Sequence, residues 1–237
     1  MKSCGPYFRL NPWLVTQMRT PFLIGALSAV ATMASAAQVY SVNTVGRINL
    51  MMVPGFNLVA NQLNRTPNNS LRNVIPRAPV ESQVLKFVNN NYQMELFDGT
   101  AWIKADGSPG TLSTSPGEGF FFFNPDPTNV TVTLEGDVPR GDPRLCMPPG
   151  FSLVSSILPQ AVSLSPGDLL PTVIELQFLS WDPATQTYKP PIFYDGSGWI
   201  HPDGTPVPPP AAPLGTGFFI FNPGPVPICW TRIFTVN

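Results

Sequence analysis

The chain has 237 residues, a formal net charge of −1 and only 11% charged residues, which is less than half the usual share in a soluble domain. It contains no basic run, so we expect no nucleic-acid partner, because such a partner requires clustered cationic side chains. The 30 prolines are spread along the chain and disfavour long helices. The 43% of hydrophobic residues is enough for a core and argues against disorder.

An export signal is predicted for residues 1–37. "MRTPFLIGALSAVATMASAA" combines a positive charge, an apolar stretch and the small-residue cleavage motif "ASA" at Ala34–Ala36. The preceding segment is long for a leader, which leaves Met18 as an alternative start. Because the apolar stretch is shorter than the ~20 residues of a spanning helix, we expect cleavage and no membrane span in the mature chain. The protein would then be secreted, periplasmic or on the cell surface.

Each half of the mature chain is predicted to consist of about six short strands, and the first half shows them in chain order. Alternating β-branched residues predict strands over 38–43 and 129–136. A Pro-Gly turn opens an apolar strand in "VPGFNLVANQLN" (53–64), and "SLRNVIP" (70–76) is consistent with one helical turn. The next segment predicts a β-hairpin around Asn89–Asn91.

The last predicted strand before 129–136 lies in "GEGFFFFNP" (117–125), which is apolar on both faces. Successive side chains of a strand point to opposite faces, so Phe120 and Phe122 oppose Phe121 and Phe123. We expect one face to line the core of its own domain and the other to pack against a loop layer or the second half. The Asn-Pro pair ends the strand, because proline cannot continue a central ladder.

Three motifs of the first half return in the second half, in the same order and at nearly constant spacing. The pairs are "VPGFNLVANQLN" and "PPGFSLVSSILP" (148–159), "FDGTAWIKADG" (97–107) and "YDGSGWIHPDG" (194–204), and "GEGFFFFNP" and "GTGFFIFNP" (215–223). The order predicts an internal duplication.

The duplication predicts a first β repeat at 38–138 and a second at 139–237. In the second repeat, 165–171 is the counterpart of the helical turn, and "IELQFLSWDPATQTYKPPIFYDG" (174–196) is the matching hairpin, with a longer loop at "DPATQ". "RIFTVN" (232–237) is a terminal strand beside the final sheet. The predicted fold is all-β, with two tandem homologous small antiparallel sandwich or barrel domains. Pseudo-twofold packing of the two domains would cover the second face of the phenylalanine strand.

Two cysteines, Cys146 and Cys229, remain after removal of the leader. An exported protein permits one disulfide between them, which is feasible if the strands that carry them are neighbours. Two buried free thiols are an equally good interpretation of the sequence.

Duplicated aromatic residues are the candidate ligand-binding set: Trp102, Trp199, Tyr92 and Tyr188. Exposed aromatic rings on a β-sandwich could stack on sugar rings, whereas buried tryptophans would fill the core of a small domain. The core interpretation is favoured, although duplication copies a core and a site alike.

The sequence offers no catalytic or metal-binding constellation that occurs in both halves. The duplicated aspartates all precede glycine, which favours hairpin turns over calcium binding or acid–base chemistry. His201 is the single histidine, and Glu118 has Thr216 as its counterpart. We therefore expect neither an enzyme nor a cofactor.

The mature chain resembles a family of uncharacterised exported β-repeat proteins from verrucomicrobial and planctomycete-type bacteria. The resemblance rests on "QVYSVNTVGRINL", on the two "PGF" motifs and on "PGEGFFFFNP" with "GTGFFIFNP". It implies short β domains on secreted or cell-surface proteins, and it brings no known ligand or functional residue. Two functions follow: a non-catalytic structural or adhesion protein that contacts envelope proteins, or a carbohydrate-binding module that holds a polysaccharide.

Overall fold

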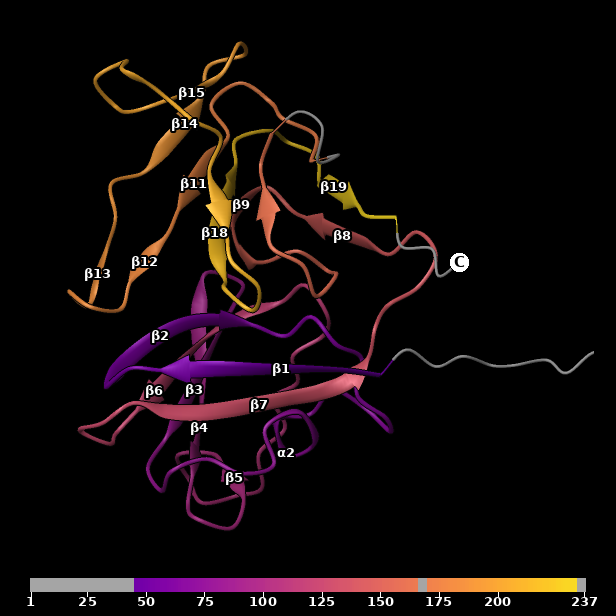
Figure 1. The fold of residues 1–237 in the computed structure, drawn as a ribbon, viewed down its shortest axis with the longest axis vertical. Helices are drawn as coiled ribbons and strands as arrows, with labels where there is room; N and C mark the ends of the chain where they lie inside the picture. Colours follow the sequence, from indigo (N-terminus) through magenta and orange to yellow (C-terminus); the bar gives the residue numbers. More distant parts are fainter. Residues whose placement is uncertain (1–44, 166–169, 234–237) are drawn as a thin grey trace, which may run out of the picture. The chain divides into compact units, whose positions relative to one another are not determined.

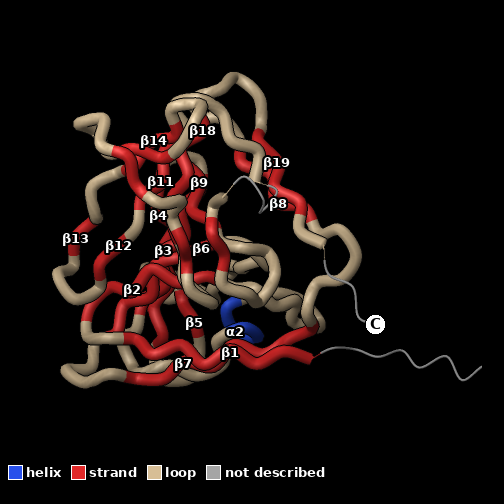
Figure 2. Tube along the Cα trace, turned by 45° about the horizontal axis from the view of Figure 1, so that its top comes forward, coloured by secondary structure: helices blue, strands red, loops and turns tan. Residues whose placement is uncertain are grey.

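The structure is a computed structural model that describes residues 45–165 and 170–233. The predicted export signal and the predicted strand at 38–43 lie outside the described residues. The described chain is almost entirely β, with one short helix, α2 (Leu71–Val74), at the predicted helical turn. The described ranges contain no helix with the length and apolar character that a membrane crossing requires. The all-β prediction is confirmed (Figure 2).

Seven strands form the described part of the first half, residues 45–138, in two antiparallel sheets. Five of them pair in the order β2-β6-β3-β4-β5, and β1 pairs with β7 along its whole length. The predicted hairpin is β3–β4, whose turn residues Asn89 and Asn90 have the positive φ angles typical of a tight hairpin turn. The strands are β1 (Val45–Met52), β2 (Gly55–Ala60), β3 (Gln83–Val88), β4 (Asn91–Phe97), β5 (Trp102–Ile103), β6 (Gly119–Asn124) and β7 (Val130–Asp137).

The second half contains more strands than the predicted six, because several of its elements are only two residues long. Its main sheet has the order β9-β18-β11-β14-β15-β16, and three further pairs are β8–β19, β10–β17 and β12–β13. The strands are β8 (Arg144–Met147), β9 (Gly150–Val154), β10 (Val162–Ser163), β11 (Gln177–Leu179), β12 (Trp181–Asp182), β13 (Thr187–Tyr188), β14 (Ile192–Tyr194), β15 (Trp199–Ile200), β16 (Pro206–Val207), β17 (Ala211–Ala212), β18 (Phe218–Asn222) and β19 (Ile228–Thr231).

The main sheets of the two halves share a strand order. The strand after the Pro-Gly turn lies at the edge, next to the phenylalanine strand, which is followed by the hairpin and the short tryptophan strand (Figure 1). The last described strand ends at Thr231, so the first two residues of the predicted strand "RIFTVN", Arg232 and Ile233, are not in a strand. The rest of that motif and most of the predicted second helical turn lie outside the described residues.

The phenylalanine strand β6 is covered on both faces, as predicted. Phe120 and Phe122 are fully buried in the core of the first half, together with residues of β1 and β7. Phe121, which points the other way, packs with Leu153 and Phe219 of the second half in a separate apolar cluster, which we call the shared cluster. Burial on both faces explains why the strand carries four consecutive phenylalanines.

Strand β18 repeats this arrangement in the second half. Phe218 and Ile220 lie in the second core, which also contains Trp230, while Phe219 joins Phe121 in the shared cluster. Each half therefore has a core of its own, and a third apolar layer lies where the two halves meet.

Backbone hydrogen bonds between the halves are reciprocal, as in a twofold contact. The N–H of Ala60 donates to the carbonyl of Gly215 at 2.9 Å, and the N–H of Ser155 donates to that of Gly117 at 2.9 Å. Ala60 and Ser155 hold the same place in the two "PGF" motifs, as do Gly117 and Gly215 in the two phenylalanine motifs. This exchange is the local pseudo-symmetry expected of two similar halves.

Candidate functional site

The two tryptophans of the candidate ligand-binding set are core residues, so the prediction of a stacking surface that included them is wrong. Trp102 is 3% exposed and Trp199 is 2% exposed. The indole N–H groups donate to buried carbonyls, at 2.7 Å to Ile75 and at 3.0 Å to Leu164. A buried indole requires such an acceptor, and both tryptophans therefore tie a sheet to the segment that covers it.

The duplicated aspartates form turns, which was the favoured interpretation. Each carboxylate accepts a hydrogen bond from the backbone N–H two residues further on, and hydrogen bonds within the turns lower the pKa of all four groups. The largest cause is the Ala101 N–H for Asp98, the Ser108 side chain for Asp106, the Ser197 N–H for Asp195 and the Thr205 N–H for Asp203. The bonds join Asp98 to Thr100 (2.7 Å), Asp106 to Ser108 (2.9 Å), Asp195 to Ser197 (2.8 Å) and Asp203 to Thr205 (2.9 Å). Glu118 is likewise engaged, in an ion pair with Lys86 at 2.8 Å.

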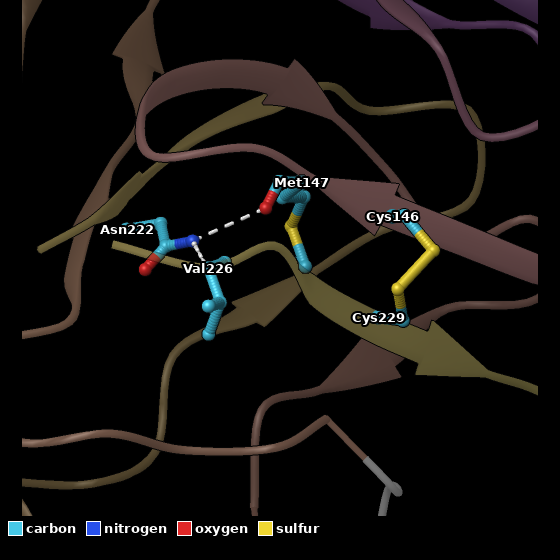
Figure 3. The surroundings of a disulfide bond; sticks show 5 residues. All are labelled: Cys146, Met147, Asn222, Val226 and Cys229. Atoms are coloured by element: carbon cyan, nitrogen blue, oxygen red, sulfur yellow. Dashed lines mark hydrogen bonds between the residues drawn. A yellow bond between two sulfur atoms is a disulfide. The ribbon is translucent and has the colours of Figure 1, made fainter. Parts of the chain in front are cut away.

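Cys146 and Cys229 form a disulfide between β8 and β19 (Figure 3). Of the two interpretations that the sequence left open, the disulfide is therefore confirmed, and the pair of free thiols is excluded. Beside it, the buried side chain of Asn222 donates to the carbonyls of Met147 (3.2 Å) and Val226 (2.8 Å). The asparagine of the "FNP" motif thus links the main sheet of the second half to the strand pair β8–β19.

The two tyrosines of the candidate set lie together at the junction of the halves. Their hydroxyl oxygens are 3.3 Å apart, and the side chains of Tyr92 and Tyr188 are 45% and 44% exposed. Desolvation, and then the hydrogen bond to Tyr188, raise the pKa of the Tyr92 hydroxyl. Tyr92 packs against Phe87 with ring centroids 5.3 Å apart, and Tyr188 packs against Trp181 at 5.0 Å.

An open hollow of about 170 Å³ lies at this junction, and we call it the aromatic depression. It is the candidate site because it brings together side chains from both halves. Phe151 is 38% exposed at its margin, and Phe219 is buried at its base. The depression is lined by Phe87, Tyr92, Phe151, Leu179, Tyr188 and Phe219.

The pseudo-equivalent position around Phe56 is filled by the chain itself. The side-chain amide of Gln186 accepts from the Phe56 N–H at 2.7 Å and donates to the Phe56 carbonyl at 3.0 Å. The indole N–H of Trp181 donates to the same carbonyl at 2.9 Å. The hairpin β12–β13 therefore lies beside β2, as Figures 1 and 2 both show.

A difference in hairpin length explains why one position is filled and the other is open. The turn between β3 and β4 has two residues, Asn89 and Asn90, because Val88 pairs with Asn91. The turn between β12 and β13 runs from Pro183 to Gln186, because Asp182 pairs with Thr187. The shorter hairpin of the first half has no counterpart of Gln186.

Sequence reasoning missed Phe87, Phe151 and Gln186, which define the depression and its filled counterpart. The longer second hairpin was visible in the sequence, but only the packing of the halves shows what its extra residues contact.

The chain matches no protein-family model, no curated protein and no solved structure. The candidate site therefore rests on its geometry.

Proposed function

We propose that this is a non-catalytic exported protein of the cell envelope or the extracellular space that acts structurally or by adhesion. The observation that carries the proposal is the aromatic depression, where Tyr92, Phe151 and Tyr188 are each more than a third exposed. Exposed apolar side chains gathered at one place favour contact with a partner. Aromatic residues are also the side chains that contribute most to protein interfaces.

The proposal includes an export signal at the N-terminus and an origin of the two halves by duplication. The common strand order and the reciprocal backbone bonds support the duplication. The duplicated aspartates accept hydrogen bonds within turns, so a structural role accounts for their carboxylates without a catalytic one.

A binding assay with whole cells of the producing organism tests the adhesion role. The purified protein, labelled with a fluorophore, is compared with the double variant Tyr92→Ala and Phe151→Ser. A control, Val226→Ser, changes an exposed apolar residue that does not line the depression. We expect the double variant to bind roughly tenfold more weakly and the control to bind like the wild type. Equal binding by all three proteins would refute the proposal.

Carbohydrate binding is the second candidate, and the adjacent exposed hydroxyls of Tyr92 and Tyr188 favour it. Affinity electrophoresis against a panel of polysaccharides separates the two functions. Retardation on one glycan that Tyr92→Ala abolishes in a folded protein supports the second candidate, and no retardation on any glycan supports the first.

A further inference from the structure

The edge of β9 at Gly150 and Phe151 has the same backbone geometry as the filled edge at Gly55 and Phe56. The φ angles of the two glycines are +90° and +88°. A Cβ atom placed on Gly55 would lie 2.6 Å from Oε1 of Gln186, whereas one placed on Gly150 would have nothing within 4 Å. The two edges therefore differ in what covers them.

The N–H and carbonyl of Phe151 point away from the sheet. The N–H of Ser155 points away from β18 and donates to the carbonyl of Gly117. Along an antiparallel edge strand, every second residue directs its N–H and carbonyl away from the neighbouring strand. The backbone groups of Leu153 and Phe151 therefore point in the same direction as those of Ser155. At Phe56 the equivalent groups are bonded to Gln186. Within residues 45–165 and 170–233, no side chain bonds to the backbone of Phe151.

We propose that the Phe151 edge and the aromatic depression bind a polypeptide turn that presents a primary amide, from glutamine or asparagine, to the Phe151 backbone. The contact that Gln186 makes with Phe56 defines the ligand chemistry: one acceptor and one donor, fixed on a turn that also carries apolar atoms. The depression is continuous with the apolar cluster that joins the halves, since Phe219 belongs to both. This inference rests on the proposed adhesion role and names the class of partner.

The probe is a cyclised peptide with the sequence of Ser180–Lys189, the hairpin that already fills the equivalent position. Binding to the purified protein is followed by shifts of the backbone amide resonances. We expect the resonances of Gly150 and Phe151 to move while that of Phe56 stays. A peptide with alanine in place of its glutamine should bind about tenfold more weakly, because it loses the paired hydrogen bonds.

A self-filled variant of the protein is the matched control. It combines Phe87→Trp with replacement of the Asn89-Asn90 turn by Pro-Ala-Thr-Gln, so that the first hairpin copies the second. We expect this variant to lose peptide binding and to show a protected Phe151 amide.

Three results would overturn the inference: no shifts with the peptide, equal binding of the alanine peptide, or undiminished binding to the self-filled variant. If the Tyr92→Ala and Phe151→Ser double variant loses cell binding while the peptide fails to bind, the partner class is wrong and the adhesion role stands.

Discussion

Single residues of this chain show how far residue type alone predicts a role. Trp102 and Trp199 recur at equivalent places, yet recurrence fits a core and a binding site equally. The structure decides for the core, because both side chains are buried and the carbonyls of Ile75 and Leu164 accept their indole N–H groups. The aspartates were more informative, because an aspartate before glycine specifies a turn locally, whatever the rest of the fold does.

The turn aspartates predict how stability depends on pH. Backbone hydrogen bonds, from Ala101 first and then Thr100, lower the pKa of Asp98, and those from Ser197 and then Gly198 lower the pKa of Asp195. With the folded pKa below the unfolded value of about 3.9, each carboxylate stabilises the fold fully above that pH. This contribution disappears as the pH falls through the folded pKa.

Urea unfolding between pH 7 and pH 3 measures this effect. The double variant Asp98→Asn and Asp195→Asn keeps an acceptor oxygen but does not titrate, so we expect its stability to fall less than that of the wild type on acidification. Parallel loss of stability in both proteins would show that these carboxylates are not responsible.

At the scale of elements, the strands were largely predictable and their contacts were not. Alternation predicted β7, the Pro-Gly turn predicted β2, the apolar run of 117–125 predicted β6, and the asparagine turn predicted the hairpin β3–β4. The two-residue strands β10, β16 and β17 of the second half escaped prediction, because so short a segment has no periodicity. The hairpin β12–β13 was predicted in length, but its contact with β2 depends on how the halves pack.

Glycines in the phenylalanine motifs allow the halves to approach each other, which predicts the effect of substitution. A Cβ atom on Gly217 would lie 2.7 Å from the backbone carbonyl oxygen of Val59, which cannot move aside as a flexible side chain would. We expect Gly217→Ala to lower the free energy of unfolding by about 1–3 kcal/mol, as measured by urea denaturation.

The matched control is Gly198→Ala, at a turn position where an added Cβ atom would have nothing within 4 Å. It should change the free energy of unfolding by less than about 0.5 kcal/mol. If the two variants were equally stable, close approach of the halves at Gly217 would be disproved.

The molecule as a whole is organised around the shared cluster. Ring centroids of Phe121 and Trp181 lie 5.2 Å apart, and those of Phe219 and Phe87 lie 5.4 Å apart, so each half inserts an aromatic side chain beside the phenylalanine strand of the other. The sequence predicted that the second face of that strand would be covered, because an apolar face requires a cover. It could not reveal that the Phe56 edge is filled while the Phe151 edge is open. This asymmetry arises from two extra residues in the β12–β13 turn and from the side-chain amide of Gln186.

Hydrogen exchange of two backbone amides tests this asymmetry most directly. The Phe56 N–H is bonded to Gln186, whereas the Phe151 N–H lies on an open edge. In native-state exchange followed by NMR, we expect the Phe56 amide to be protected and the Phe151 amide to exchange at a rate close to that of an exposed strand edge. Equally slow exchange of both amides would mean that the Phe151 edge is covered, and would contradict an open binding site there.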